Sequence, residues 1–208
     1  LHARLSRVGC RGGGYGAGAV SEKGLPDRLA QLHSGEEHLR SDSLILIANN
    51  PILHAHLAVI ECAMDLMNVL RMAGSNDEDD KVIQVLGMRI FNDLASSLKL
   101  ALSGYSQTAA MILRDVLETV FLIDRFRGDA ESIAQWRLAD TTNRWKLFSP
   151  KNVRTHLDKR DRFEGKKRDA AYRLLSTLAA HPSMEGIAML RPKGMDAHMG
   201  PFVEEATL

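Results

Sequence analysis

GYSQTAAMILRDVLETVFLIDRFRG, residues 104–128, is the stretch that decides the fold. Between Ala109 and Ile123 eleven of fifteen residues are apolar, and they occupy almost every side of a helix. A helix that is apolar nearly all round belongs inside a bundle rather than on its surface. Ser106 is predicted to cap its start and Gly128 to end it, since glycine readily adopts the left-handed conformation that closes helices. The sequence therefore predicts a central helix against which other helices pack.

The few polar residues of this helix form its most informative feature. At about 100° per residue, Arg114, Glu118 and Arg125 fall within one narrow strip. The spacing from Arg114 to Glu118 is that of an intrahelical ion pair. In so apolar a helix these charges need a partner, a cleft or solvent, because an unpaired buried charge is costly. Two interpretations stay open: a structural pair that ties the central helix to a neighbour, or a polar pocket with a catalytic role.

Apolar residues at helical spacing predict the rest of the bundle. The row Leu53, Leu57, Ile60, Met64 and Met67 gives one buried face to a helix over residues 51–72. Further helices are expected at about residues 82–104, 130–148, 149–158 and 166–181. No stretch shows sustained β alternation bounded by hairpin turns. The predicted fold class is therefore all-α, a helical bundle of five to six helices.

The chain divides into three parts by composition. Residues 1–40 are predicted to be a flexible tail containing Gly and Arg, with a short helix from Asp27 to Leu32 followed by a polar connection. Residues 41–185 form the predicted helical bundle domain. Residues 186–208 contain Gly and Pro at irregular spacing, so we expect an irregular C-terminal segment that is truncated. Because the chain begins with Leu1 rather than Met and its start is of low complexity, we also expect a fragment, a processed product or an over-extended reading frame.

Bulk composition excludes several classes of protein. The 27 basic and 26 acidic residues nearly balance, so nothing global favours nucleic acid or a membrane surface as a partner. Cys10 and Cys62 form no disulfide framework, which favours the reducing cytoplasm. The apolar stretch from Leu44 to Ile60 is interrupted by Asn49, Asn50, Pro51 and two histidines, so no membrane span is expected there.

No residue pattern indicates a metal or a cofactor. The chain contains no HExxH, Walker loop or GxSxG sequence, and no Glu-x-x-His pair of the kind that di-iron bundles use. His54, Glu61 and Asp65 share one face of the helix over 51–72. That arrangement suits a metal site, but it is also what any amphipathic helix presents to water. We therefore expect no cofactor and no metal.

Tyr172 and His181 complete the set of candidate site residues. His181 ends the helix predicted for 166–181, where positive charge is favoured and a proton is exchanged near neutral pH. It serves either as a helix cap or as a general acid–base group. The preceding segment, 151–173, holds nine basic and four acidic residues. This excess of positive charge suits either a phosphate-binding face or an ordinary solvated surface.

Two short motifs carry a resemblance to known proteins. GYSQTAAMILRDVLE, which starts at residue 104, and YRLLSTLAAHPS, which starts at residue 172, resemble uncharacterised bacterial all-helical proteins distantly similar to the HEPN superfamily. The resemblance covers about residues 50–185 and implies an all-α fold. The matching positions are Gly104, Tyr105, Arg114, Glu118, Tyr172, Ser176, His181 and Ser183.

Some members of the wider HEPN group are metal-independent ribonucleases that carry an Arg followed, after four to six residues, by a His. Two pairs in this chain have that spacing, Arg28 with His33 and Arg191 with His198, which is the number that chance alone produces. Neither pair lies in a good context, because the first falls outside the resemblance and the second contains Pro192 and Gly194. Arg173 and His181 are separated by seven residues, outside the pattern.

Three hypotheses follow for the function. The first is a binding or interaction module in which Arg114 and Glu118 organise the core, and which self-associates through the exposed apolar positions of its first two helices. The second is a HEPN-like metal-independent ribonuclease or defence effector, acting on RNA, in which Arg114, Glu118, Tyr172 and His181 line one cleft. The third is a regulator that binds a small ligand in the same cleft. We prefer the first.

Overall fold

The computed structural model describes residues 26–191, 193, 196–204 and 208. These residues form helices and no strand, which confirms the all-α class. In chain order the elements are α1 (Asp27–Asn49), α2 (Pro51–Met72), α3 (Glu78–Leu102), α4 (Ser106–Phe126), α5 (Ala130–Leu138), α6 (Thr141–Phe148), α7 (Pro150–Arg160), α8 (Lys167–Leu175), the π-helical turn η1 (Ser176–Ala180) and α9 (Met184–Ala188). The predicted count of five to six is wrong for this part of the chain, because two predicted helices are divided and others lie in segments predicted to be irregular.

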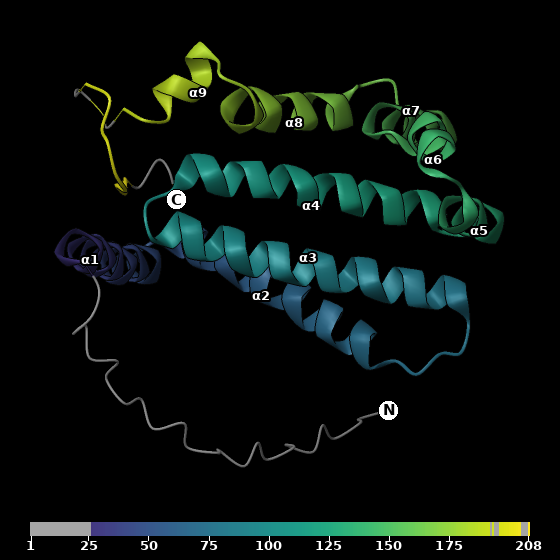
Figure 1. Cartoon of the computed structure of the whole chain (residues 1–208), viewed down its shortest axis with the longest axis horizontal. Helices are drawn as coiled ribbons and strands as arrows, with labels where there is room; N and C mark the ends of the chain where they lie inside the picture. The colour runs from purple at the N-terminus through teal and green to yellow at the C-terminus, as the bar shows by residue number, and fades with distance from the viewer. Residues whose placement is uncertain (1–25, 192, 194–195, 205–207) are drawn as a thin grey trace.

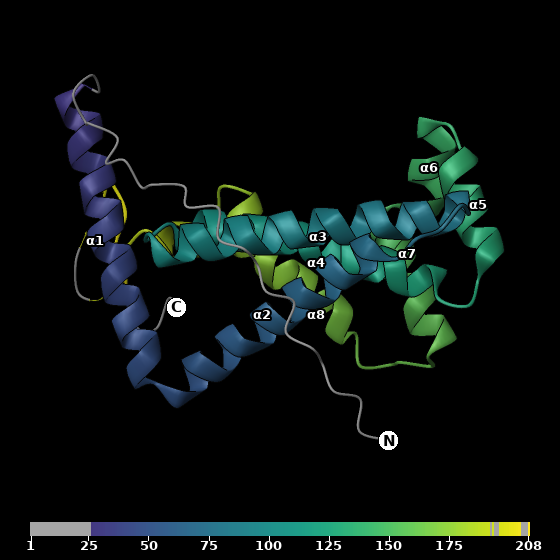
Figure 2. The same cartoon turned by 90° about the horizontal axis from the view of Figure 1, so that it is seen from below.

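Helices α3 and α4 run side by side through the middle of the molecule (Figure 1). Helix α2 lies along one side of α3, while α7, α8 and α9 lie along the opposite side of α4. Helix α1 crosses one end of this stack and α5 and α6 gather at the other end (Figure 2). Helix α4 thus has the central position that its composition predicts.

Short polar and glycine signals set the ends of the central helices. The Asp77 side chain accepts a hydrogen bond from the backbone N–H of Asp79 at 2.7 Å and so caps the start of α3. Gly104 follows α3 with a φ of +88°, the left-handed conformation predicted for it. Gly128 closes the segment after α4 in the same way, with a φ of +75°. The predicted cap at Ser106 is wrong, since Tyr105 holds the cap position and its side chain makes no capping bond.

The buried core lies at the end of the bundle where α4 meets α5, α6 and α7. Its fully or almost fully buried members are Leu86, Phe126, Phe148, Val153 and Leu157. The Phe126 ring meets the rings of Trp136 and Phe148 edge to face, each at a centroid distance of 6.0 Å. Edge-to-face aromatic contacts contribute stabilising free energy beyond that of burying the apolar surface of each ring. With Trp136 these residues come from five helices, α3 to α7, so the cluster holds the short helices α5 to α7 against α3 and α4.

The helix predicted over residues 130–148 is divided into α5 and α6 at Ala139 and Asp140. Asp140 accepts a hydrogen bond from the backbone N–H of Asn143 at 2.9 Å and thereby starts a new helix. The Arg144 side chain donates to the carbonyls of Trp136 at 2.9 Å and Ala139 at 2.6 Å, which end α5. Satisfied end groups on both sides stabilise the break.

The N-terminal helix is longer than predicted. Helix α1 continues past Leu32 to Asn49, so it includes residues 27–40 of the predicted flexible tail, while residues 1–25 lie outside the described part of the chain. Ion pairs within α1 support the polar stretch, among them Arg40 with Glu37. The buried Ser43 hydroxyl donates to the carbonyl of Leu102 at 2.9 Å and anchors α1 to the end of α3. A tertiary contact thus favours helix where the local pattern indicated a connection.

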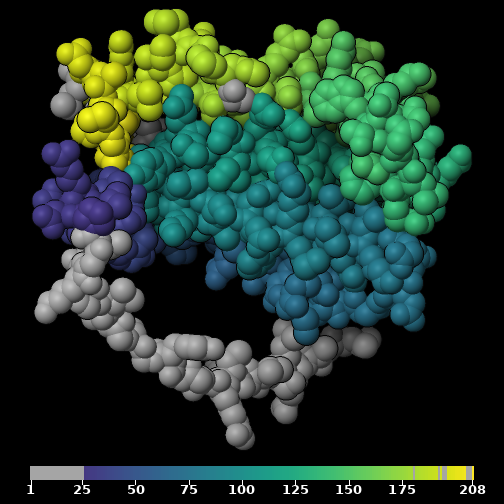
Figure 3. All heavy atoms as spheres, viewed as in Figure 1, coloured from purple at the N-terminus to yellow at the C-terminus, as the bar shows by residue number. Residues whose placement is uncertain are grey.

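The C-terminal part returns to the bundle. The helix predicted over 166–181 ends as α8 at Leu175 and continues as the π-helical turn η1, and Ala171 and Leu174 in α8 are exposed. The backbone N–H of Phe202 donates to the carbonyl of Gly104 at 3.2 Å. A side chain at Gly104 would approach the Phe202 backbone nitrogen to 2.6 Å, so only glycine allows this contact. In the space-filling view the C-terminal segment lies against α1 (Figure 3).

Tyr105 links the first helix to the central pair. Its hydroxyl donates to Glu36 Oε1 at 2.7 Å. This bond raises the pKa of Tyr105 to about 12, and it lowers the pKa of Glu36 together with a contact from His33. Gly104 and Tyr105, two positions of the resemblance, therefore have structural roles at the junction of α1, α3 and α4.

The Tyr105→Phe variant is expected to lose about 1–2 kcal/mol of unfolding free energy at neutral pH, because it removes a hydrogen bond to a charged acceptor. The wild-type advantage is complete at neutral pH and is lost as the pH rises from 10, the ordinary pKa of tyrosine, towards 12. The reason is that Tyr105 loses its proton at a lower pH in the unfolded chain than in the folded protein. Between pH 10 and 12 this deprotonation stabilises the unfolded chain relative to the folded protein. Urea unfolding of both proteins between pH 7 and 11 measures the difference. Equal stability of the two proteins at pH 7 would show that the bond contributes nothing.

Candidate functional site

The ion pair predicted from spacing on the central helix is present. Arg114 Nε lies 3.2 Å from Glu118 Oε1, and both side chains are about one-quarter exposed. The N–H is not directed at the oxygen, so Glu118 Oε1 is buried without a hydrogen-bond partner among the described residues. The attraction between these two side chains is therefore mainly Coulombic, and the Oε1 oxygen of Glu118 accepts no hydrogen bond from a described residue.

Tyr172 joins this pair, and so does an arginine that sequence reasoning missed. The Arg114 guanidinium lies 5.6 Å from the centroid of the Tyr172 ring, and that of Arg154 lies only 3.8 Å from it. Arg154 is just 7% exposed. Its Nη2 donates to Asp169 Oδ1 at 3.2 Å, and Asp169 also pairs with Arg173 at 2.7 Å. The sequence shows Arg154 only as one of nine basic residues in its segment, with no signal that it is buried.

His181 is the candidate that no contact connects to the others. It follows η1 in an extended conformation, as the residue before a proline does, and its side chain is exposed. In the described part of the chain, no hydrogen bond, ion pair or ring contact links it to Arg114, Glu118 or Tyr172. The interface between α4 and η1 is instead made by Gln107, whose Nε2 donates to the carbonyls of Leu178 at 3.1 Å and Gly186 at 2.8 Å.

The serines of the second motif act locally. Ser183 caps α9, since its hydroxyl accepts a hydrogen bond from the backbone N–H of Gly186 at 2.9 Å. It also donates to the carbonyl of Thr177. The Ser176 hydroxyl is buried at the start of η1. The ribonuclease hypothesis and RNA as a partner stay predictions, because the structure gathers three of the four proposed residues, Arg114, Glu118 and Tyr172, and connects none of them to His181.

A cleft of about 600 Å³ opens next to the Arg114–Glu118 pair. Glu118 lines this cleft, whereas Arg114 and Tyr172 do not. Helices α3 to α7 all contribute to its walls. Its lining consists of Val85, Leu86, Arg89, Asp115, Glu118, Thr119, Leu122, Trp136, Thr141, Arg144, Trp145, Phe148, Pro150 and Val153. Leu86, Phe148 and Val153 belong to the core cluster, and Leu122 and Trp136 pack against it, so the cleft is an opening into the core. Its volume falls within the range typical of small-molecule sites.

Most charges around the cleft already have partners. Arg89 pairs with Asp115, with Nη2 at 2.6 Å and Nε at 2.8 Å from Oδ2. Burial raises the pKa of the neighbouring Asp93, and the close Asp115 carboxyl raises it further. Arg144 donates through Nε and Nη2 to the carbonyls that end α5. Its guanidinium carbon lies 5.3 Å from the centroid of the Trp136 ring. Glu118 is the lining residue whose buried carboxylate oxygen has no hydrogen bond within the described structure.

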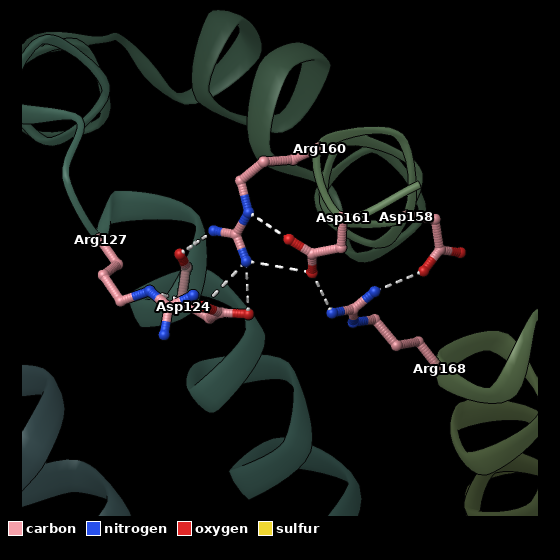
Figure 4. Close-up of polar contacts among 6 residues, drawn as sticks. All are labelled: Asp124, Arg127, Asp158, Arg160, Asp161 and Arg168. Carbon is pink, nitrogen blue, oxygen red and sulfur yellow. Dashed lines mark hydrogen bonds and ion pairs between the residues drawn. The ribbon is translucent and has the colours of Figure 1, made fainter. Parts of the chain in front are cut away.

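Four of the nine basic residues of segment 151–173 form ion pairs: Arg154, Arg160, Arg168 and Arg173. Arg160 lies between Asp124 and Asp161, and Arg168 contacts Asp161 and Asp158 (Figure 4). Arg160, with help from Arg168, lowers the pKa of Asp161 to about 2. The contribution of this carboxylate to stability is complete above pH 3.8 and is lost as the pH falls towards 2. The network ties α4, α7 and α8 together, which favours a structural role for these arginines over phosphate binding.

Helix α2 carries a second apolar face that the sequence analysis overlooked. The predicted row beginning with Leu53 is half-buried and faces the bundle. A second row, Ile52, Ala55, Val59, Cys62, Leu66 and Val69, is exposed along its whole length. We name these six residues the α2 seam. By length and composition α2 is also long and apolar enough to cross a membrane, with a mean hydropathy of 1.3, so the prediction of no membrane partner stays a prediction.

The spacing of the α2 seam was visible in the sequence, because its members recur every three or four residues. The sequence predicted the row that packs inside, but it could not show that the second row stays exposed. Among the described residues no group of three or more His, Cys, Asp or Glu side chains is placed to hold a metal ion. Cys62 is free and exposed, and Cys10 lies outside the described residues.

Comparisons of the chain with protein-family models, curated proteins and solved structures found no match.

Proposed function

We propose that this protein is a non-enzymatic interaction module that pairs with a second copy of itself through the α2 seam. The observation that carries the proposal is an uninterrupted row of six exposed apolar residues at alternating spacings of three and four. This is the pattern of a coiled-coil contact between helices. Exposed apolar stripes of this length mark interaction sites on soluble proteins. In this proposal the Arg114–Glu118 pair has a structural role in the central helix.

The seam is complementary to itself when two copies run antiparallel. A two-fold axis halfway between Val59 and Cys62 places Ala55 opposite Leu66 of the second copy and Val59 opposite Cys62. Small residues then face larger ones, as close packing of helices requires. No charged residue lies within the seam, so pairing buries no unpaired charge.

The area available suits a weak dimer. Ile52, Val59, Leu66 and Val69 are each 61–68% exposed. Burying such a side chain from full exposure contributes about 1.5–3 kcal/mol. The two seams contain eight of these side chains, each about two-thirds exposed, so burying them gains roughly 8–16 kcal/mol. Association costs about 4–15 kcal/mol in lost freedom. A surplus of about 8 kcal/mol lies within the range of this difference and corresponds to a dissociation constant of about 1 μM, so we expect a dimer that dissociates on dilution through the micromolar range.

Sedimentation equilibrium of the full chain tests this proposal. Wild type is expected to convert from monomer to dimer with increasing concentration, and Leu66→Glu is expected to stay monomeric. Asn68→Glu, an exposed change on the polar side of α2, is the matched control and should dimerise like wild type. Circular dichroism verifies that each variant stays helical. A wild-type protein that is monomeric at all concentrations, or that binds phosphatidylcholine vesicles through α2 instead, would contradict self-pairing.

Cross-linking tests the orientation. With Cys10 replaced by Ser, Cys62 lies about 4.5 Å along the axis from its counterpart in the antiparallel pair, because three residues separate them. A short bismaleimide should therefore join two copies. A cysteine at position 52, in a Cys62→Ser background, lies about 26 Å along the axis from its counterpart and should not cross-link. Efficient cross-linking at position 52 would indicate a parallel pair.

A further inference from the structure

The cleft formed by helices α3 to α7 is lined by apolar side chains of two kinds. Leu86, Phe148 and Val153 are buried members of the core cluster. Val85 on α3 and Trp145 on α6 line the same cleft but are 58% and 69% exposed. Apolar surface in contact with water is unfavourable, so a molecule that covers these exposed side chains gains free energy. The cleft therefore offers a ligand both buried and exposed apolar walls.

Trp145 is the tryptophan of the cleft whose ring is left uncovered. Both tryptophans of the chain line the cleft. Trp136 already contacts the Phe126 ring at a centroid distance of 6.0 Å and the Arg144 guanidinium at 5.3 Å. Among the described residues no aromatic ring or arginine contacts the Trp145 indole in this way. An aromatic ligand can therefore make the stacked or edge-to-face contact that Trp145 lacks.

The charged side chains that line the cleft balance one another. They are two arginines, Arg89 and Arg144, and two carboxylates, Asp115 and Glu118. Asp115 pairs with Arg89 at 2.6 Å, and Glu118 pairs with Arg114 at 3.2 Å. The lining thus has no formal net charge, and its field favours neither an anion nor a cation. Selection of a ligand therefore depends on the apolar and aromatic walls.

We propose that this cleft binds an aromatic molecule of two or three rings and recognises the rings irrespective of the charge of the attached head group. The rings lie among the core residues and against the Trp145 indole, while the head group stays in water. A cleft of about 600 Å³ suits such a molecule, since small-molecule sites span about 300–1,000 Å³. This site is separate from the α2 seam and does not depend on dimerisation.

Four probes test the ligand class: 4-biphenylmethanol, 4-biphenylmethylamine, biphenyl-4-carboxylate and the saturated alcohol 4-cyclohexylcyclohexanemethanol. Isothermal titration calorimetry with the full chain gives their affinities. The three biphenyls are expected to bind within about threefold of one another, because the charges of the lining balance. The saturated alcohol is expected to bind about three- to tenfold more weakly than the aromatic alcohol, because it makes no aromatic contact. Absence of binding by the biphenyls, a larger preference for one head group, or equal affinity of the two alcohols would overturn the proposal.

Variants of the full chain then locate the site. Trp145→Ala should weaken 4-biphenylmethanol about three- to tenfold and should reduce its advantage over the saturated alcohol. Leu138→Ala, an exposed apolar change on α5 outside the cleft, is the matched control and should alter neither affinity. Leu66→Glu, which disrupts the α2 seam, should bind all four probes like wild type. With circular dichroism like that of wild type, an unchanged affinity in Trp145→Ala or a lost one in Leu66→Glu would exclude this cleft as the site.

Discussion

Replacing Phe126 with alanine is expected to lower the free energy of unfolding by about 3–5 kcal/mol. Phe126 is 2% exposed, and its ring contacts Trp136 and Phe148 edge to face. The substitution removes the apolar burial of the ring, breaks both aromatic contacts and leaves a cavity that the surrounding helices fill only in part. A domain of this size is stable by only about 5–15 kcal/mol, so the variant should be close to unfolding at 37 °C.

Urea denaturation followed by circular dichroism measures this loss. Val120→Ala is the matched control, because Val120 lies on the same helix but is 42% exposed, and it should cost less than about 1 kcal/mol. Emission of Trp136 in Phe126→Ala should shift to longer wavelength as water reaches the cluster. A loss below about 1 kcal/mol for Phe126→Ala would mean that the joint between α4 and the short helices does not depend on this ring.

The second large effect concerns the buried arginine beside Tyr172. Asp169→Asn is expected to lower the free energy of unfolding by about 3 kcal/mol, because it leaves Arg154 buried without its carboxylate. Arg154 Nε and Nη1 already make no hydrogen bond within the described structure, so the bond from Nη2 to Asp169 and the Tyr172 ring, 3.8 Å from the guanidinium, together compensate its burial. Arg173 also loses its partner, but its side chain is exposed and that pair contributes little.

A double-mutant cycle separates the two partners of Asp169. Arg173→Ala alone should change stability by less than about 1 kcal/mol. Arg154→Met in the Asp169→Asn background should recover most of the loss, because methionine fills the buried space and carries no charge. If the double variant is no more stable than Asp169→Asn, the cost does not arise from the buried charge. The cycle thereby tests the structural interpretation of the cluster that contains Arg114 and Tyr172.

Much of the helical framework follows from local signals. The apolar period and Pro51 place α2 at Pro51–Met72, as the sequence predicts, because the pattern, the proline and the following turn agree. Gly104 and Gly128 mark the ends of the central segment for the same kind of reason. The division of α5 from α6 was missed, since Asp140 and Arg144 compete with a helix pattern that continues across them.

The candidate site shows where local reasoning ends. Arg114 and Glu118 could be paired from sequence because they are four apart on one helix. Arg154 and Asp169 lie on α7 and α8, so their meeting at Tyr172 depends on how two short helices pack against α4. The cleft is likewise built from five helices, and no sequence pattern indicates which polar atoms in it lack a partner.

By itself, the sequence determined the all-α class, the central position of residues 104–128 and the Arg114–Glu118 pair. Each depends on the helical repeat, which places neighbouring residues on known faces. Tertiary structure decided that a second apolar row of α2 stays exposed, which arginine is buried and where a cleft stays open. Those outcomes depend on side chains far apart in the chain filling one volume, and a local repeat contains no information about that packing.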